Sequence, residues 1–395
     1  MPRSANGAGT IRKKTVCRNG KEYTYWEARY TTGYHPGTGK QMQRSISGKT
    51  KKEVAEKLRA ATASIDNGSY HEPQKMTVGA WLDIWLEEYI RDTVKPLTLA
   101  SYRMQINTHI KPALGKTKLC QLTPDAVQRF YNSLKRGKDN PALSPKSIKN
   151  VHGVLHSALK KAVMLHYIPY NPTEACTLPR IEKQEVKPLD ADAVTALLKA
   201  AQKDKYENLY ILALFSGMRQ GEILGLSWDC IDFETGSITV KQQLQRDKES
   251  REYHIVTPKN GKSRSFLAAP FIMDMLHKQK LWQMEMQLQA GQRWNNLWNL
   301  VFTDKTGRYI LADGLYKHFK ALVQQIGYPA ARFHDLRHSF ATAALQAGGD
   351  IKTVQQVLGH HTAAFTLDVY AHSTPQAQKQ NADNIEKYIL SVINA

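Results

Sequence analysis

The stretch Phe333-His334-Asp335-Leu336-Arg337-His338-Ser339-Phe340 carries the strongest information on the fold and chemistry of this chain. It predicts the beginning of a helix whose buried stripe is Leu336, Phe340 and Ala344. His334 and Arg337 lie three residues apart, so we expect both side chains on one face, where they could bind one ligand together.

A second helix is expected directly downstream. Asp350 can cap its first turn, Gly359 can end it, and His360 then follows just past the end. Tyr370 lies ten residues beyond His360. By itself, a tyrosine at this position would be read as a core or surface residue.

Upstream, glycines interrupt an apolar helix at Ser216-Gly217, and Arg219 begins the next helix. An arginine at a helix start lies beside free backbone N–H groups, which suits the binding of an anion. Glu222, one turn later, could orient the arginine. The alternative is a surface arginine paired with Glu222, and the motif alone favours that alternative.

A β-hairpin is predicted between these helices. Residues 251–258 and 263–268 resemble strands, and Asn260-Gly261 between them is a strong two-residue turn signal. Lys259 would then lie at the hairpin tip, with Lys262 as the substitute if the register differs. Most lysines at such tips only keep the turn soluble.

The composition points to a polyanionic partner. The 395 residues include 55 Lys and Arg against 35 Asp and Glu, a net charge of +20, and 42% are apolar. Such a chain is expected to form two or three globular domains and to bind DNA or RNA. The absence of a long apolar run and of any cysteine pair at metal spacing predicts a soluble cytoplasmic protein without a zinc site or disulfides.

The amino-terminal part, residues 1–75, carries 15 Lys and Arg against 6 Asp and Glu. Residues 22–30 and 41–47 are predicted strands, and Thr50 can cap a helix that follows. A small basic sheet of this kind can lie in the major groove of DNA. A packing module without DNA contacts is the alternative.

Residues 76–178 show helical periodicity, with a second helix expected after Pro96 and two more beginning at Pro124 and Pro145, where Thr123 and Ser144 can act as N-caps. They predict a four-helix module with basic faces. Residues 179–189 read as a linker, and the remainder as mainly helical with one strand-rich insert. The fold class is therefore mainly α with small β-sheets (α+β).

These motifs, taken together, resemble the tyrosine recombinase (phage integrase) family. The ordered set is Gly-x-Arg-x-x-Glu, a hairpin lysine, His-x-x-Arg-His, Leu-Gly-His and a tyrosine ten residues later, over residues 190–372. The similarity is greatest to integrases of conjugative transposons from Gram-positive bacteria. The resemblance implies an arm-binding domain (1–75), a core-binding domain (76–178), a linker (179–189), a catalytic domain (190–375) and a tail helix (376–395) that docks on a neighbouring protomer.

The resemblance also implies a role for each candidate residue. Tyr370 would attack the scissile phosphate to form a 3′-phosphotyrosyl link, and Lys259 would protonate the departing 5′ oxygen. Arg219 and Arg337 would bind the non-bridging phosphate oxygens. His334 and His360 would hydrogen-bond the phosphate or transfer protons. No metal or nucleotide cofactor is implied.

The expected partner is double-stranded DNA, at the ends of a mobile element and at its target sites, in the cytoplasm of a bacterium. A homo-oligomer on DNA, a tetramer, is expected, and an accessory excision factor is a further candidate partner. Two alternatives stay open at this point: a type IB topoisomerase-like enzyme that relaxes DNA, and a catalytically silent DNA-binding regulator. Occupation of every catalytic position by a competent residue argues against the silent regulator.

Overall fold

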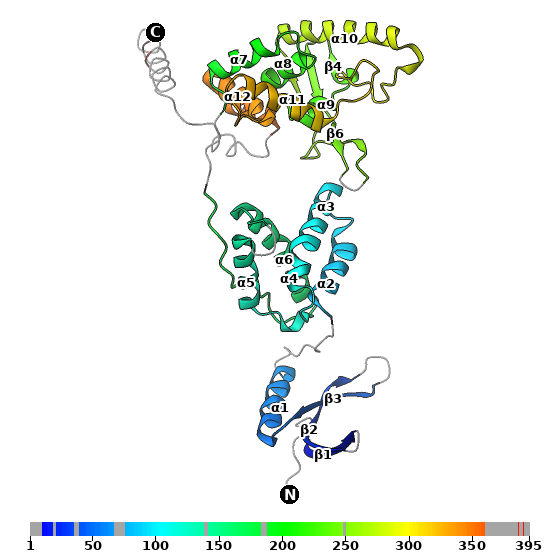
Figure 1. Cartoon of the computed structure of the whole chain (residues 1–395), viewed down its shortest axis with the longest axis vertical. Coiled ribbons are helices and arrows are strands. Elements are labelled where there is room, and N and C mark those ends of the chain that lie inside the picture. The colour runs from blue at the N-terminus through cyan, green and yellow to red at the C-terminus, as the bar shows by residue number, and fades with distance from the viewer. Residues whose placement is uncertain are drawn as a thin grey trace. The chain divides into compact units, whose positions relative to one another are not determined.

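The protein is seen here in a computed structural model (Figure 1). The residues that it describes are 10–18, 21–34, 39–66, 76–137, 141–182, 188–247, 250–359, 386 and 390. They fall into two units, Met1–Glu182 and Lys183–Ala395, which are described separately. The expected class, mainly helical with small β-sheets, is confirmed. Across the described part of the chain, no helix has the length and apolarity needed to span a membrane.

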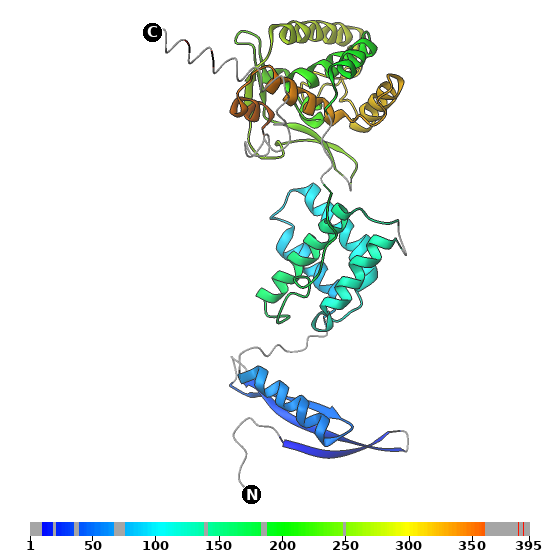
Figure 2. The same cartoon turned by 90° about the vertical axis from the view of Figure 1, so that its left-hand side faces the viewer.

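The amino-terminal sheet is antiparallel, in the order β1 (Thr10–Arg18), β2 (Lys21–Tyr34), β3 (Gln41–Gly48). Helix α1 (Lys51–Asp66) packs along one face of it (Figure 2). Its first turn is capped as expected, because Thr50 Oγ1 accepts the Glu53 N–H at 3.2 Å. The core between sheet and helix is small and consists of Ala28, Tyr30, Val54 and Leu58.

Residues 78–164 form four helical rods. The first is α2 (Val78–Ile84), extended by a π-helical turn over Trp85–Ile90, and the second runs from α3 (Pro96–Gln105) through Ile106–Ile110 into α4 (Lys111–Leu114). The others are α5 (Pro124–Arg136) and α6 (Pro145–Met164). Thr123 and Ser144 cap the last two, as the sequence predicts. Trp81 is fully buried at the centre, and its Nε1 donates to the carbonyl of Ala158 at 2.9 Å.

The second unit is built from seven α-helices and two small sheets within residues 188–359. The helices are α7 (Ala191–Ala201), α8 (Glu207–Ser216), α9 (Gln220–Leu224), α10 (Pro270–Ala290), α11 (Ala312–Gln325), α12 (Phe333–Gln346) and α13 (Ile351–Leu358). One sheet has the order β4 (Ile231–Asp232), β5 (Ser237–Val240), β8 (Arg264–Leu267). The other pairs β6 (Gln243–Arg246) with β7 (Tyr253–Val256).

The predicted hairpin is wrong in its pairing. Strands form near the expected residues, and the turn is present, with the Gly261 N–H donating to Pro258 O at 2.8 Å. However, β7 pairs with β6 and β8 pairs with β5, so the turn connects two different sheets. Asn-Gly specifies a local reversal of the chain, but the strand partners are supplied by segments elsewhere in the sequence.

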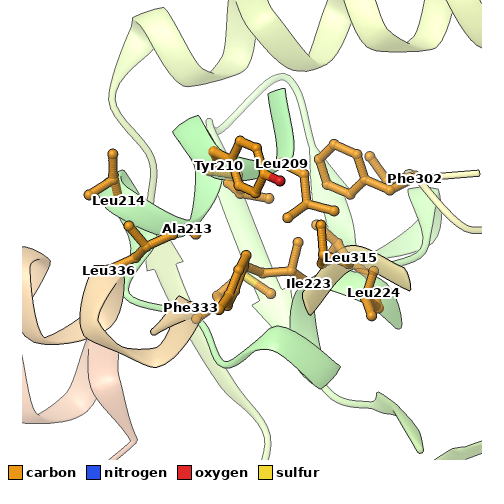
Figure 3. Close-up of a cluster of buried hydrophobic side chains, with 14 of the residues drawn as sticks. Leu209, Tyr210, Ala213, Leu214, Ile223, Leu224, Phe302, Leu315, Phe333 and Leu336 are labelled. Carbon is orange, nitrogen blue, oxygen red and sulfur yellow. The ribbon is translucent and has the colours of Figure 1, made fainter. Parts of the chain in front are cut away.

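Helix α8 forms the centre of the core of this unit. Its side chains Leu209, Tyr210 and Ala213 converge with Ile223 of α9 and Phe333 of α12 (Figure 3). Both α9 and α12 begin with a capping box, made by Glu222 and by Asp335 respectively. Both helices carry candidate site residues in their first turns.

Gly217 ends α8 and allows close packing at this point. Its φ is +60°, and a Cβ placed there would lie 2.5 Å from Phe340 and 2.7 Å from Leu358. Only glycine fits both this backbone conformation and this space. The end of α8 therefore lies directly against α12 and α13.

Candidate active site

Arg219 is held at the start of α9 by Glu222. The Glu222 carboxylate is fully buried, and it accepts the Arg219 backbone N–H at 2.9 Å and its Nη1 at 2.8 Å. The Arg219 side chain remains 22% exposed. The guanidinium is thus held by the buried Glu222 carboxylate and is still accessible to a ligand from solvent.

Glu222 has a second cationic partner, Arg264 on β8. The Arg264 Nη1 and Nη2 donate to the two Glu222 oxygens at 3.0 and 2.6 Å, and its Nε donates to Val357 O at 2.6 Å. Burial alone would raise the pKa of Glu222, but the hydrogen bonds and charge of Arg264, followed by those of Arg219, lower it to about 2. The carboxylate is therefore ionised at neutral pH and bridges two arginines.

Sequence reasoning missed Arg264. One signal was available: Arg264 and buried Phe266 lie two residues apart on β8, so both point to the same face of the sheet. A charged side chain on a buried face needs a buried partner of opposite charge. Glu222 is that partner.

Arg337 lies in the first turns of α12 and is only 2% exposed. Its Nη1 donates to Gly217 O and its Nη2 to Leu358 O, both at 2.6 Å. These bonds join α12 to the ends of α8 and α13. The Arg337 guanidinium thus lies deeper in the structure than that of Arg219.

His334 lies one turn before Arg337 and retains exposed surface. Desolvation of the ring by the surrounding protein, followed by the charges of His338, Arg337 and Arg219, lowers the pKa of His334 to about 4. The imidazole is therefore neutral at pH 7. The charges of Arg337 and Arg219 both act on the His334 ring, and Arg337 donates to the carbonyl of Gly217, two residues before Arg219, so three predicted site residues from two helices belong to one cluster.

The turn that carries Lys259 is tied to this cluster. Asn260 Nδ2 donates to Gly359 O at 2.8 Å, and Gly359 is the left-handed cap that ends α13. Lys259 itself is exposed in the turn, and so is Lys262. The turn therefore lies beside the residue that directly precedes His360.

The other predicted site residues lie outside the described part of the chain. These are His360 and Tyr370. The predicted tail helix, residues 376–395, also lies outside it apart from Glu386 and Leu390. The helix before His360 does agree with the sequence, because Asp350 accepts the Thr353 N–H at its start at 2.9 Å.

The geometry suits the binding of a phosphodiester. Arg219, Arg337 and the adjoining lysine turn supply positive charge, and the carboxylate that binds Arg219, that of Glu222, is already neutralised by two cations. Guanidinium groups are well shaped for phosphate oxygens and can stabilise charge that develops there. Within the described residues, no group of three or more His, Cys, Asp and Glu side chains is arranged to hold a metal ion.

Two family models match the sequence. The phage integrase family matches residues 187–377, and the phage integrase N-terminal SAM-like domain matches residues 77–135. The first match contains every candidate site residue. The second falls on the first two helical rods and on α5.

Two related proteins match this chain over almost its whole length. A tyrosine recombinase XerC-like protein of Caldanaerobacter subterraneus subsp. tengcongensis is 31% identical over 94% of this chain and 97% of its own. The ICEBs1 integrase of Bacillus subtilis is 23% identical over 90% of this chain and 95% of its own.

Solved structures share the fold. The Tn1549 transposon integrase, in complex with a circular intermediate DNA, has a TM-score of 0.66 at 21% identity, over 79% of this chain and 100% of that one. A lambda integrase tetramer bound to a Holliday junction has a TM-score of 0.54 at 19% identity, over 88% and 96% of the two chains. With the 31% identical relative matched along nearly its full length, these findings show that the chain belongs to the phage integrase family of tyrosine recombinases, the site-specific enzymes that cleave and rejoin DNA.

Proposed function

We propose that this recombinase cleaves DNA with Tyr370 as nucleophile and with Arg219, Arg337, Lys259, His334 and His360 as its other catalytic residues. The observation that carries the assignment is the cluster of Arg219, Arg337 and His334 beside the Lys259 turn, assembled from segments as far as 120 residues apart. The arginines bind the non-bridging oxygens of the scissile phosphate. Their charge compensates the negative charge that builds up in the transition state.

The reaction is a transesterification that conserves the number of phosphodiester bonds. The Tyr370 oxygen attacks phosphorus, the bond from phosphorus to the 5′ oxygen breaks, and Lys259 protonates that oxygen. A phenol has a pKa of about 10, so its proton must be accepted as it attacks, a role for His334 or His360. A pKa of about 4 keeps the His334 imidazole neutral at pH 7 but makes it a weak base, so His334 is better suited to a hydrogen bond with the phosphate and His360 to accepting the proton. A 5′ hydroxyl from a second duplex then reverses the step on a new partner.

The substrate that we propose is the pair of ends of a conjugative transposon and its target sites. The similarity to the ICEBs1 integrase and to the Tn1549 transposon integrase supports this class of element. The tetramer formed by lambda integrase on a Holliday junction supports a tetrameric assembly on two duplexes. An accessory excision factor would determine the direction of the reaction in the bacterial cytoplasm.

We further propose a role for each part of the chain. We assign arm-site binding to residues 1–75, core-site binding to 76–178, linkage to 179–189, catalysis to 190–375 and docking on a neighbouring protomer to 376–395. The amino-terminal sheet supports the assignment of arm-site binding, because the face that α1 leaves uncovered carries Arg12 and Lys14. Arg12 Nη2 and Lys14 Nζ lie 2.9 and 3.4 Å from the carboxylate oxygens of Glu27 on the same face. Such a basic face can bind the phosphates that line a major groove.

A covalent-adduct assay tests the proposal. Full-length protein is incubated, without metal or nucleotide, with a nicked duplex that contains the candidate element end, and then denatured. We expect a 3′ protein–DNA adduct that Tyr370→Phe abolishes while DNA binding persists. Tyr316→Phe is the matched control, because Tyr316 is an exposed tyrosine on α11 of the same unit. An adduct that persists in Tyr370→Phe would refute the nucleophile. Exchange of strands between two duplexes separates recombination from simple relaxation.

A further inference from the structure

The carboxyl end of α13 is held by three side chains from other elements. The carbonyls of three consecutive residues, Val357, Leu358 and Gly359, accept hydrogen bonds from Arg264, Arg337 and Asn260 respectively. The last carbonyls of a helix have no partner within the helix, and this end carries partial negative charge, so cations bind well there. The helix end that leads directly into His360 is therefore held at three successive positions.

Arg264 connects this helix end to the start of α9. Its Nε contacts Val357, and its two Nη atoms contact both oxygens of Glu222, which in turn binds the backbone and the side chain of Arg219. One planar guanidinium thus spans two segments that are 135 residues apart. A Cβ on Gly359 would lie 3.1 Å from the Arg264 side chain, so the helix end packs closely against it.

The burial of Arg264 argues against direct contact with DNA. Its side chain is only 10% exposed, and all three of its nitrogens already donate to protein acceptors. Glu222 is fully buried beneath it. Whatever Arg264 contributes to the reaction must therefore pass through the residues that it holds.

We propose that Arg264 is a positioning residue that sets Arg219, through Glu222, and the end of α13 that precedes His360 in a single arrangement around the scissile phosphate. The inference rests on the proposed function, because it assigns Arg264 the task of orienting two of the catalytic residues named there. Arginine suits this task because its rigid fork can satisfy a carboxylate in bidentate fashion and a carbonyl at the same time. A lysine ammonium cannot reproduce that geometry.

The test compares two substrates. One is the nicked duplex with a normal scissile phosphate, and the other carries a methylphosphonate there, which removes the charge that Arg219 would neutralise. We expect Arg264→Gln to slow adduct formation about 100-fold on the phosphate, the scale of effect for a small misplacement of a catalytic group. On the methylphosphonate we expect a loss of less than about 10-fold, the pattern also expected of Arg219→Gln. A purely structural defect would lower both rates by the same factor.

Arg246→Gln is the matched control. Arg246 also donates through Nε to a carbonyl, that of Arg251, and through Nη1 to a carboxylate, that of Asp313, but it is well exposed on β6. We expect this variant to match the wild type on both substrates. Equal rates for Arg264→Gln and the control, or equal losses on both substrates, would overturn the proposal.

Two further variants guard against a folding defect. Arg264→Lys keeps the positive charge beside Glu222, and it should recover part of the rate on the phosphate while its melting temperature stays near that of the wild type. The double variant Glu222→Gln/Arg264→Gln should be no slower than the slower single variant, because both act through one contact. Failure of even Arg264→Lys to fold would assign Arg264 a structural role and overturn the proposal. Absence of any adduct from the wild type would instead show that the proposed function itself is wrong.

Discussion

Replacing Glu222 with glutamine tests the charge network at its centre. The wild-type carboxylate accepts four hydrogen bonds from Arg219 and Arg264 while fully buried. Glutamine keeps one acceptor oxygen but turns an NH2 group toward donors and removes the negative charge between two cations. Breaking one partner out of a buried ion pair costs about 3–5 kcal/mol.

The lowered pKa of Glu222 gives a second value for the free energy that this carboxylate contributes to folding, and it shows how that contribution depends on pH. Moving the pKa of Glu222 from its ordinary value of 4.5 to about 2 corresponds to about 3.4 kcal/mol at pH 7, at about 1.4 kcal/mol per pH unit. Because the folded-state pKa is the lower one, this stability is fully present above pH 4.5 and is lost as the pH falls toward 2. At pH 3, about 1.4 kcal/mol should remain. The difference between wild type and Glu222→Gln should shrink accordingly.

The stability difference between wild type and Glu222→Gln can be measured by urea unfolding at pH 7 and pH 3. Proteolysis of the unfolded fraction, with quantification of peptides from residues 188–359, restricts the measurement to the second unit. Asp313→Asn is the control, because Asp313 forms an exposed ion pair with Arg246. Its effect should stay below about 1 kcal/mol at both pH values. A stability loss in Glu222→Gln that is equally large at pH 3 and pH 7 would refute the reasoning, since it would show that the ionised carboxylate is not the source.

Three further predictions concern packing, catalysis and binding. Gly217→Ala should lower the free energy of unfolding by about 2–4 kcal/mol, because the new Cβ would clash with Phe340 and Leu358 and because the backbone there is left-handed. Gly236 also has a positive φ but has open space around it, so Gly236→Ala should lower the free energy of unfolding by only about 1 kcal/mol. Chemical denaturation measures both values. Equal costs at the two glycines would contradict the packing argument. Lys259→Ala should slow cleavage of an ordinary substrate but recover activity when sulfur replaces the 5′ oxygen, because a thiolate leaves without a proton. Lack of recovery in that adduct assay would remove Lys259 from the role of general acid. The logarithm of the DNA association constant, measured by fluorescence anisotropy, should fall linearly with the logarithm of salt concentration. An association constant that does not change with salt would contradict binding through phosphates.

The sequence by itself determined the local features of this protein. The caps at Thr123, Ser144 and Asp350 and the helix end at Gly359 were all predictable, because each depends on hydrogen bonds between residues a few positions apart. The family was predictable too, from five motifs whose order and spacing survive without knowledge of any contact. The reversal of the chain at Asn260-Gly261 belongs to the same group.

Only the tertiary structure decided which distant segments meet. The turn signal could not show that β7 and β8 belong to different sheets, because nothing in the local sequence indicates that β7 pairs with β6 and β8 with β5, and not with each other. The role of Arg264 was not predictable from the sequence, because its partners Glu222 and Val357 lie 42 and 93 residues away. The depth of Arg337 likewise depends on how α8, α12 and α13 pack. Local hydrogen bonds are encoded within one turn of chain, whereas the pairing of buried charges exists only once the core has brought those charges together.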